Sequence, residues 1–162
     1  MLVYHHHSPY RITDVVATSK KMLGTRLITK QTGEEGRPVN VVYLAERHYI
    51  RRETYFAITM DRTSGGPLII ASSQGGVDIE TVAVENPNAI VKVPIDIQEG
   101  FQQKHADILC QALDFVDNKA DATQQMKRLY DLFIKKDCTL IEVNPFVETH
   151  DGRSKYPTTN MN

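Results

Sequence analysis

The sequence predicts an α+β fold, because segments typical of hairpins and segments typical of helices occupy separate blocks of the chain. Residues 53–61 alternate along an extended strand, with Phe56, Ile58 and Met60 on one face, and a glycine-rich turn follows them. Residues 101–134 instead carry apolar side chains at the i, i+3, i+4, i+7 spacing of amphipathic helices. The pattern indicates an antiparallel or mixed sheet with flanking helices.

The N-terminal part of the chain predicts one helix and two strands. Ser8 and Pro9 are typical of an N-cap and a first-turn proline, apolar residues then recur at helical spacing, and Gly24 is a typical helix stop. A short strand is predicted over 26–30. After a loop containing two glycines, an apolar and β-branched run predicts a second strand over 39–46.

The rest of the chain predicts strands, helices and turns that alternate in blocks. Proline, glycine and asparagine separate the blocks, as they do at turns and helix ends. The expected segments are strands 53–61 and 67–71 around a turn at 63–66, a helix over 78–84 ended by 86–88, a strand over 89–93, helices within 101–113 and 126–134, a strand over 140–147 and a hairpin turn at 150–153. Residues 1–153 are expected to form one domain, and the polar segment 154–162 a disordered tail.

The strand over 140–147 carries the candidate chemistry. Side chains alternate between the faces of a strand, so Leu140, Glu142 and Asn144 share one face, while Ile141, Val143 and Pro145 share the apolar one. A carboxylate and an amide oxygen two residues apart suit Mg²⁺, which takes one or two protein oxygens together with substrate phosphate. Pattern alone favours the simpler interpretation, an edge strand with one solvated polar face.

Composition excludes several classes of function. The net charge is −1, so no overall field attracts nucleic acid or an anionic membrane, and neither is expected as a partner. No apolar run approaches the roughly 20 residues of a membrane span. Cys110 and Cys138 have neither metal-ligand spacing nor the count of a disulfide scaffold, and two free thiols are expected.

Five motifs occur in an order that resembles a known family. They are KQTG at 30–33, GRPVN at 36–40, YFAITMDR at 55–62, GGVDIE at 75–80 and LIEVNP at 140–145. Together they resemble the ATP-grasp domain of the β subunit of succinyl-CoA synthetase, also called succinate–CoA ligase. The resemblance runs from about Ser8 to Arg153, and Arg51-Arg52-Glu53 is most similar to the mitochondrial ADP-forming members.

The resemblance implies roles for four residues. Asn144 matches a magnesium-binding asparagine, and Glu142 matches a glutamate that faces the phosphohistidine loop of an α subunit. Glu53 matches a glutamate that contacts ATP or ADP, and Ala45 lies in a segment that touches the base through its backbone. For Glu53 the residues alone favour a surface salt bridge with Arg51 or Arg52. Similarly, Gly75-Gly76 could present amides to a phosphate, although a tight turn is the simpler interpretation.

The resemblance also implies a reaction, a partner and a compartment. The family converts succinyl-CoA, phosphate and ADP to succinate, CoA and ATP, as an α–β heterodimer in the mitochondrial matrix. The chain resembles only the middle of that β subunit, without its phosphate lysine, glycine-rich loop, second magnesium ligand or succinate-binding domain. A fragment truncated at both ends and inactive alone is therefore expected. The alternatives are a catalytically silent module that binds the α subunit, and a related malate or citrate acyl-CoA ligase.

Overall fold

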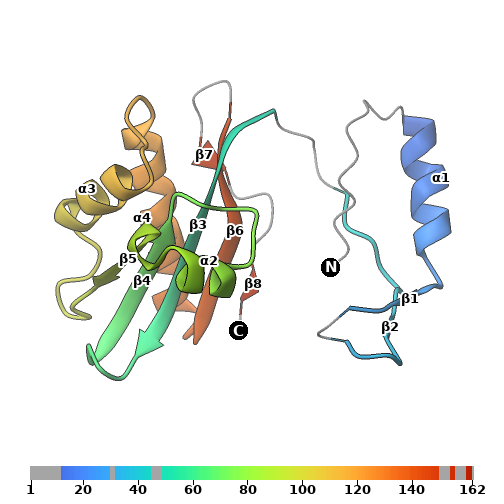
Figure 1. Cartoon of the computed structure of the whole chain (residues 1–162), viewed down its shortest axis with the longest axis horizontal. Coiled ribbons are helices and arrows are strands. Elements are labelled where there is room, and N and C mark those ends of the chain that lie inside the picture. The colour runs from blue at the N-terminus through green and yellow to red at the C-terminus, as the bar shows by residue number, and fades with distance from the viewer. Residues whose placement is uncertain (1–11, 30–31, 45–48, 150–153, 156–159, 162) are drawn as a thin grey trace. The chain divides into compact units, whose positions relative to one another are not determined.

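A computed structural model describes residues 12–29, 32–44, 49–149, 154–155 and 160–161 (Figure 1). The chain divides into two compact units, residues 1–46 and residues 47–162. No helix in the described part is long and apolar enough to cross a lipid bilayer.

The first unit consists of one helix and a two-stranded ribbon. It contains α1 (Ile12–Met22), β1 (Arg26–Leu27) and β2 (Arg37–Pro38), with β1 and β2 antiparallel. The predicted helix stop at Gly24 is confirmed, because Gly24 has a positive φ of 78° and its N–H donates to the Val39 carbonyl at 2.9 Å. The predicted cap, Ser8 and Pro9, lies outside the described residues.

The prediction of a strand over 39–46 is wrong for residues 39–44, the part of this segment that the structure describes. The ribbon ends at Pro38; beyond it the Val39 N–H donates to the Thr25 carbonyl at 2.9 Å, and residues 40–44 are in no strand. A β-branched run favours extended backbone, but a strand also needs a neighbour for its backbone hydrogen bonds. Within its described residues, this segment has no such neighbour beyond Val39.

The second unit is built on one antiparallel sheet. Among the described residues six strands form it, in the order β5-β4-β3-β6-β7, with β8 also paired to β6. The strands are β3 (Ile50–Asp61), β4 (Gly66–Ser72), β5 (Ile90–Pro94), β6 (Leu140–Thr149), β7 (Ser154–Lys155) and β8 (Asn160–Met161); the helices are α2 (Ile79–Glu85), η1 (Pro87–Ala89), α3 (Gln103–Ala112) and α4 (Lys119–Lys135). The predicted α+β class and the predicted hairpin of β3 and β4 are confirmed.

The hydrophobic core lies between one face of this sheet and the helices α3 and α4 (Figure 1). The apolar face predicted for the strand over 53–61 supplies Phe56 and Ile58, both fully buried. The helices supply apolar side chains at the predicted helical spacing. Other members of this core are Ile69, Val93, Leu109, Leu113, Phe115, Met126, Leu129, Phe133, Ile141, Val143 and Phe146.

The opposite face of the sheet is covered in part by α2 (Figure 1). Val82 of this helix is buried, and Tyr55 and Ala57 of β3, which point away from the main core, are buried as well. The central strand β3 is therefore covered on both faces between Thr54 and Ile58.

The C-terminal residues add to the outer side of β6. Ser154–Lys155 pairs with Val147 and Glu148, and Asn160–Met161 pairs with Ile141 and Glu142, both antiparallel. A disordered tail is the expectation from the sequence, whereas the described residues of this segment form two short strands. The turn predicted at 150–153 lies outside the described residues.

Candidate functional site

The polar face predicted for β6 is present as far as Asn144. Ile141 and Val143 are fully buried in the core, whereas Glu142 and Asn144 are half-buried on the other face. Glu142 lies opposite Ala57 of β3, so it shares the face of the sheet that α2 covers only in part. The strand therefore brings both candidate residues to the same open side of the sheet.

A β-bulge at Asn144-Pro145 changes the alternation of β6. The register runs from Phe56 opposite Val143 to Thr54 opposite Phe146, so Asn144 and Pro145 together face Tyr55, and their peptide bond is cis. The prediction that Pro145 continues the apolar face is wrong, because Phe146 takes the next core position. The bulge adds one residue, and that residue shifts every later side chain to the other face.

Asn144 is held by the loop that follows β4. Its Oδ1 accepts a hydrogen bond from the Gly76 N–H at 2.8 Å, and its Nδ2 donates to the Val77 carbonyl at 2.9 Å. We call residues 75–77 the glycine loop. The side chain predicted to bind a cation therefore also fixes this loop to β6.

The same loop contacts Glu53. The Gly75 N–H donates to the Glu53 carbonyl at 3.2 Å, and a Cβ added to Gly76, which has a positive φ of 70°, would collide with the Glu53 carboxylate. Glu53 and Asn144 thus lie on either side of Gly76, although they come from different strands. The tight-turn interpretation of Gly75-Gly76 is supported, since both amides are already hydrogen-bonded within the protein.

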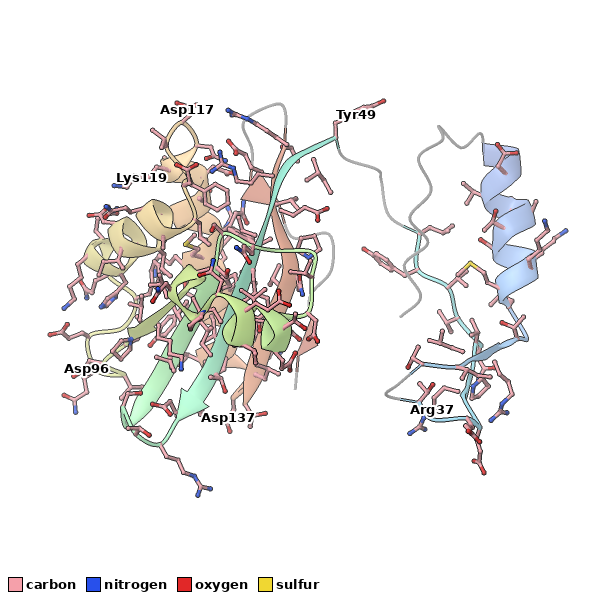
Figure 2. The ribbon with its side chains drawn as sticks, viewed as in Figure 1. Arg37, Tyr49, Asp96, Asp117, Lys119 and Asp137 are labelled. Atoms are coloured by element: carbon pink, nitrogen blue, oxygen red, sulfur yellow. The ribbon has the colours of Figure 1, made fainter. Side chains whose placement is uncertain are left out.

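Arg51 and Arg52, which were considered as salt-bridge partners of Glu53, pair with other carboxylates instead. The Arg51 Nη1 lies 3.2 Å from the Glu148 Oε1, and the Arg52 Nη1 lies 2.6 Å from the Asp114 Oδ2. The Arg51 Nη1 also lies 4.0 Å from the Oδ2 of Asp117, in the connection between α3 and α4 (Figure 2). These two arginines join the sheet to that connection. Ala45 lies outside the described residues.

Tyr55 lies in the site, although no role is predicted for it from the sequence. It is only 5% exposed and forms a side-chain hydrogen bond with Glu142. Burial raises the pKa of Tyr55 well above its ordinary value, and the charge of Glu142, this hydrogen bond and the charge of Glu80 raise it further. The one signal in the sequence is that Tyr55 lies on the same face of the predicted strand as Glu53.

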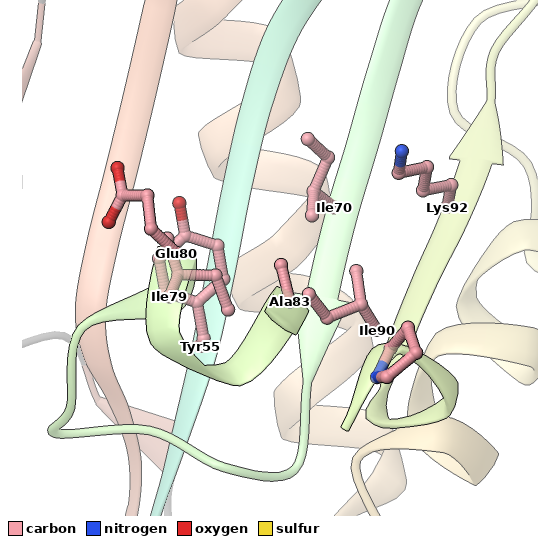
Figure 3. Close-up of a pocket in the computed structure, with 8 residues that line it drawn as sticks. Tyr55, Ile70, Ile79, Glu80, Ala83, Ile90 and Lys92 are labelled. Carbon is pink, nitrogen blue, oxygen red and sulfur yellow. The ribbon is translucent and has the colours of Figure 1, made fainter. Parts of the chain in front are cut away.

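An open groove of about 340 Å³ lies beside Tyr55 on this face of the sheet. Glu80 of α2 and Lys92 of β5 lie at its two ends (Figure 3). The groove is otherwise largely apolar and is lined by Ile70, Ile79, Ala83, Pro87 and Ile90. An apolar floor with a carboxylate and an ammonium group at its ends therefore adjoins the candidate residues of β6.

The oxygen donors on this face fit a magnesium ion in part. The Asn144 Oδ1 accepts a hydrogen bond from the Gly76 N–H, and Glu142 supplies a carboxylate two residues away. Mg²⁺ commonly takes only one or two protein oxygens and completes its shell with water and phosphate. Within the described ranges no group of three or more histidine, cysteine, aspartate or glutamate side chains could hold a metal ion.

Comparison with known proteins defines the class to which this fold and site belong. The family model for the ATP-grasp domain matches residues 7–148. The chain belongs to the ATP-grasp domain family.

Within this family the chain is a homologue of succinate–CoA ligase β subunits. It is 55% identical over 140 residues to the mitochondrial ADP-forming β subunit of Dictyostelium discoideum. The aligned region covers 86% of this chain and 32% of that protein. It is 55% identical over 137 residues to the ADP-forming subunit of Columba livia (84% and 33%) and 50% identical over 136 residues to the human GDP-forming subunit (83% and 32%). The chain spans about a third of the length of these relatives.

Solved structures support the fold at much lower sequence identity. An ATP citrate lyase from Methanothrix soehngenii has a TM-score of 0.57 at 18% identity, over 92% of this chain and 32% of that one. An acetyl-coenzyme A synthetase from Ca. Korarchaeum cryptofilum has a TM-score of 0.55 at 12% identity, over 93% and 82%. Both share the fold of this chain, and the family model confirms the ATP-grasp class predicted from the five motifs.

Proposed function

We propose that the chain is the nucleotide-binding part of a succinate–CoA ligase β subunit. The observation that carries this proposal is the meeting of Glu53 and Asn144 at Gly76, in a chain 55% identical to ADP-forming β subunits. In this assignment Glu53 and Ala45 contact ATP or ADP, Asn144 binds Mg²⁺, and Glu142 faces the phosphohistidine of an α subunit.

The chemistry of each group suits its assigned role. A magnesium ion bound by Asn144 would neutralise phosphate charge during phosphoryl transfer. Glu142 is held by Tyr55 and can accept a hydrogen bond from an imidazole N–H, which orients a histidine for in-line transfer. The exposed carboxylate of Glu53 can accept hydrogen bonds from ribose hydroxyls or from an exocyclic amine.

The partner, the acid and the compartment follow from the relatives. Both ADP-forming relatives are named as mitochondrial β subunits of a succinate ligase, so we place the chain in the mitochondrial matrix beside an α subunit. Succinate is favoured over citrate or malate, because the likeness to a citrate enzyme is one of fold alone, at 18% identity.

We expect the chain to turn over nothing by itself. Phosphoryl transfer requires cations placed around the phosphates as well as metal ligands. The predicted oxygen ligands on this face are Glu142 and Asn144, and the backbone amides of Gly75 and Gly76 are already hydrogen-bonded within the protein. This last observation also favours a second candidate function, a silent module that binds the α subunit without handling nucleotide.

The experiment is a fluorescence titration of the 162-residue chain with a fluorescent ADP analogue in the presence of Mg²⁺. We expect saturable binding that Glu53→Gln and Asn144→Ala each weaken about fivefold or more, since one loses the carboxylate and the other the metal ligand. The matched control is Glu99→Gln, an exposed glutamate paired with Lys104 away from this face, which should leave the Kd unchanged.

Two further measurements separate the alternatives. If the chain binds no nucleotide but co-purifies with the α subunit of a relative, the silent module replaces the nucleotide-binding part. With that α subunit, succinyl-CoA, phosphate and ADP, a coupled assay should detect no ATP synthesis. Measurable turnover would contradict the expectation that the chain cannot support catalysis even with an α subunit.

A further inference from the structure

The helix α3 begins with a hydrogen bond to a histidine. Its N-cap is Gln102, and the backbone N–H of Gln102 donates to the Nδ1 atom of His105 at 3.0 Å. His105 is the third residue of the helix, the position from which a glutamate or glutamine side chain reaches back in a capping box. A side chain that titrates near neutral pH therefore closes the start of this helix.

This contact defines the protonation state of the imidazole. A backbone N–H can only donate, so the Nδ1 atom that it meets must present a lone pair. Neutral imidazole has one such nitrogen, whereas both nitrogens of the imidazolium ion are donors. The structure thus holds His105 as the neutral tautomer with its proton on Nε2. A second proton would set a donor against the Gln102 N–H.

The surroundings of His105 also disfavour a positive charge. The side chain is buried in the first turn of a helix, where the free backbone N–H groups already carry a partial positive charge. Burial lowers the pKa of His105 below its ordinary value, the charge of Lys104 lowers it further, and the charge of Glu99 opposes them. Burial and the hydrogen bond therefore favour the same neutral form.

The elements packed against α3 place aromatic and apolar groups beside this histidine. The centroid of the Phe101 ring lies 6.0 Å from that of the imidazole and 6.0 Å from that of Tyr130 in α4. Burial raises the pKa of Tyr130, so its phenol is neutral where a histidine titrates. The strand β4 has no ionisable side chain, and Lys92 of β5 lines the groove on the other face of the sheet.

We propose that His105 is a pH-sensitive cap, which closes the first turn of α3 when its imidazole is neutral and opens this turn when it is protonated. Opening releases the Gln102 N–H and loosens Phe101, which packs between the imidazole and Tyr130. The cap is separate from the proposed nucleotide site, because α3 covers the face of the sheet opposite to Glu142 (Figure 1).

The direction of the pH dependence follows from the lowered pKa. The folded pKa of His105 lies below the unfolded value of about 6.5, so the unfolded chain takes up this proton first as the pH falls. The contribution of the cap to stability is therefore complete above about pH 6.5 and is lost as the pH falls from there toward the folded pKa.

The test is amide hydrogen exchange of the full ¹⁵N-labelled chain by NMR, expressed as protection factors so that the intrinsic pH dependence of exchange is removed. The ¹⁵N shifts of the imidazole follow its protonation in the same samples. As His105 takes up its proton, we expect the protection of the Gln102 N–H to fall about fivefold or more, the size expected for loss of a helix cap. The Leu113 N–H, which donates to the Leu109 carbonyl at the other end of α3, should keep its protection.

Three variants separate a titrating cap from a merely structural one. His105→Gln supplies an acceptor that does not titrate, so the protection of Gln102 should be high across the whole pH range. His105→Ala supplies none, so the protection should be low throughout. The matched control is Gln111→Ala, at an exposed position in the same helix, which should keep the pH dependence of the wild type.

Two results would overturn the proposal. One is a loss of Gln102 protection in His105→Gln that equals the loss in the wild type over the same pH range. The other is an imidazole whose ¹⁵N shifts place its proton on Nδ1 at neutral pH, because that nitrogen could not accept the Gln102 N–H. Neither measurement needs nucleotide, metal or an α subunit, so the outcome is independent of the proposed function.

Discussion

At the scale of single residues, the contacts that define the site are polar and come from distant parts of the chain. Tyr55 shows this well: its ring is buried under α2 while its hydroxyl forms a hydrogen bond with Glu142 of the neighbouring strand. Glu80 of α2 adds a second negative charge near the same phenol. The phenol of Tyr55 therefore stays protonated beside Glu142, to which it can donate.

The raised pKa of Tyr55 predicts a dependence of stability on pH. Its folded pKa lies above the unfolded value of about 10, so the unfolded chain releases this proton first. The stabilisation is therefore complete below about pH 10 and is lost as pH rises from there toward the folded pKa. We expect urea unfolding between pH 9 and 11 to show this loss, and Tyr55→Phe to reduce it.

Tyr43→Phe is the control for this measurement, because Tyr43 is 69% exposed. It should leave the pH dependence as in the wild type. Burial also raises the pKa of Tyr130, so some loss should remain in Tyr55→Phe. An unchanged pH profile in Tyr55→Phe would contradict the burial of the phenol against Glu142.

At the scale of elements, a cluster of charged side chains joins the sheet to the helical layer. Glu148 at the end of β6 is only 3% exposed and lies between Arg51 and Arg52 of β3. Arg52 also donates to the Asp114 carbonyl at 2.6 Å, in the connection between α3 and α4. The two adjacent arginines, considered from the sequence as surface partners of Glu53, therefore link the sheet to the connection between α3 and α4.

Glu148→Gln tests this link. The variant keeps the shape of the side chain but removes the charge that both arginines face. Because one of them is half exposed and still solvated, we expect a loss of about 1–3 kcal/mol in the free energy of unfolding, less than for a fully buried pair. Urea denaturation followed by circular dichroism measures this change.

The comparison variant is Asp131→Asn, which removes an exposed pair with Lys127 within α4. A change below about 0.5 kcal/mol is expected there. If the two variants cost the same, Glu148 does not link the two layers.

At the scale of the whole molecule, the core and the described residues of the site belong to the same unit. Every residue of the hydrophobic core cluster lies between Phe56 and Phe146, inside the unit of residues 47–162. Glu53, Glu142 and Asn144 lie there as well. The unit is long enough to bury a core of its own, so its stability should not depend on residues 1–46.

We therefore expect a chain that begins at Arg47 to unfold cooperatively in urea, with a free energy of unfolding within about 0.5 kcal/mol of the second unit in the full chain. Phe146→Ala serves as a reference in both lengths, because its fully buried ring packs against Phe56 and Phe115. Loss of this ring should lower the free energy of unfolding by about 3–5 kcal/mol in each of the two chain lengths. A shortened chain without a cooperative transition would show that the first unit is needed for folding.

The sequence by itself determined the helices and strands whose apolar side chains recur at a regular spacing, and it determined the polar face of β6. Helical spacing predicted α3 and α4, alternation predicted β3 and the start of β6, and the turn at 63–66 predicted the hairpin. These signals are local, since each depends on side chains a few positions apart. The resemblance added the ATP-grasp class, because five motifs in order are more specific than any period.

Only the tertiary structure decided which backbone and side-chain groups meet. The run at 39–46 lacked a neighbouring strand within its described residues, and the bulge at Asn144-Pro145 moved Phe146 into the core. The contacts of Asn144 with the glycine loop and of Tyr55 with Glu142 join positions far apart in the sequence. Hydrogen bonds between such positions depend on strand register and loop path, which no local spacing encodes.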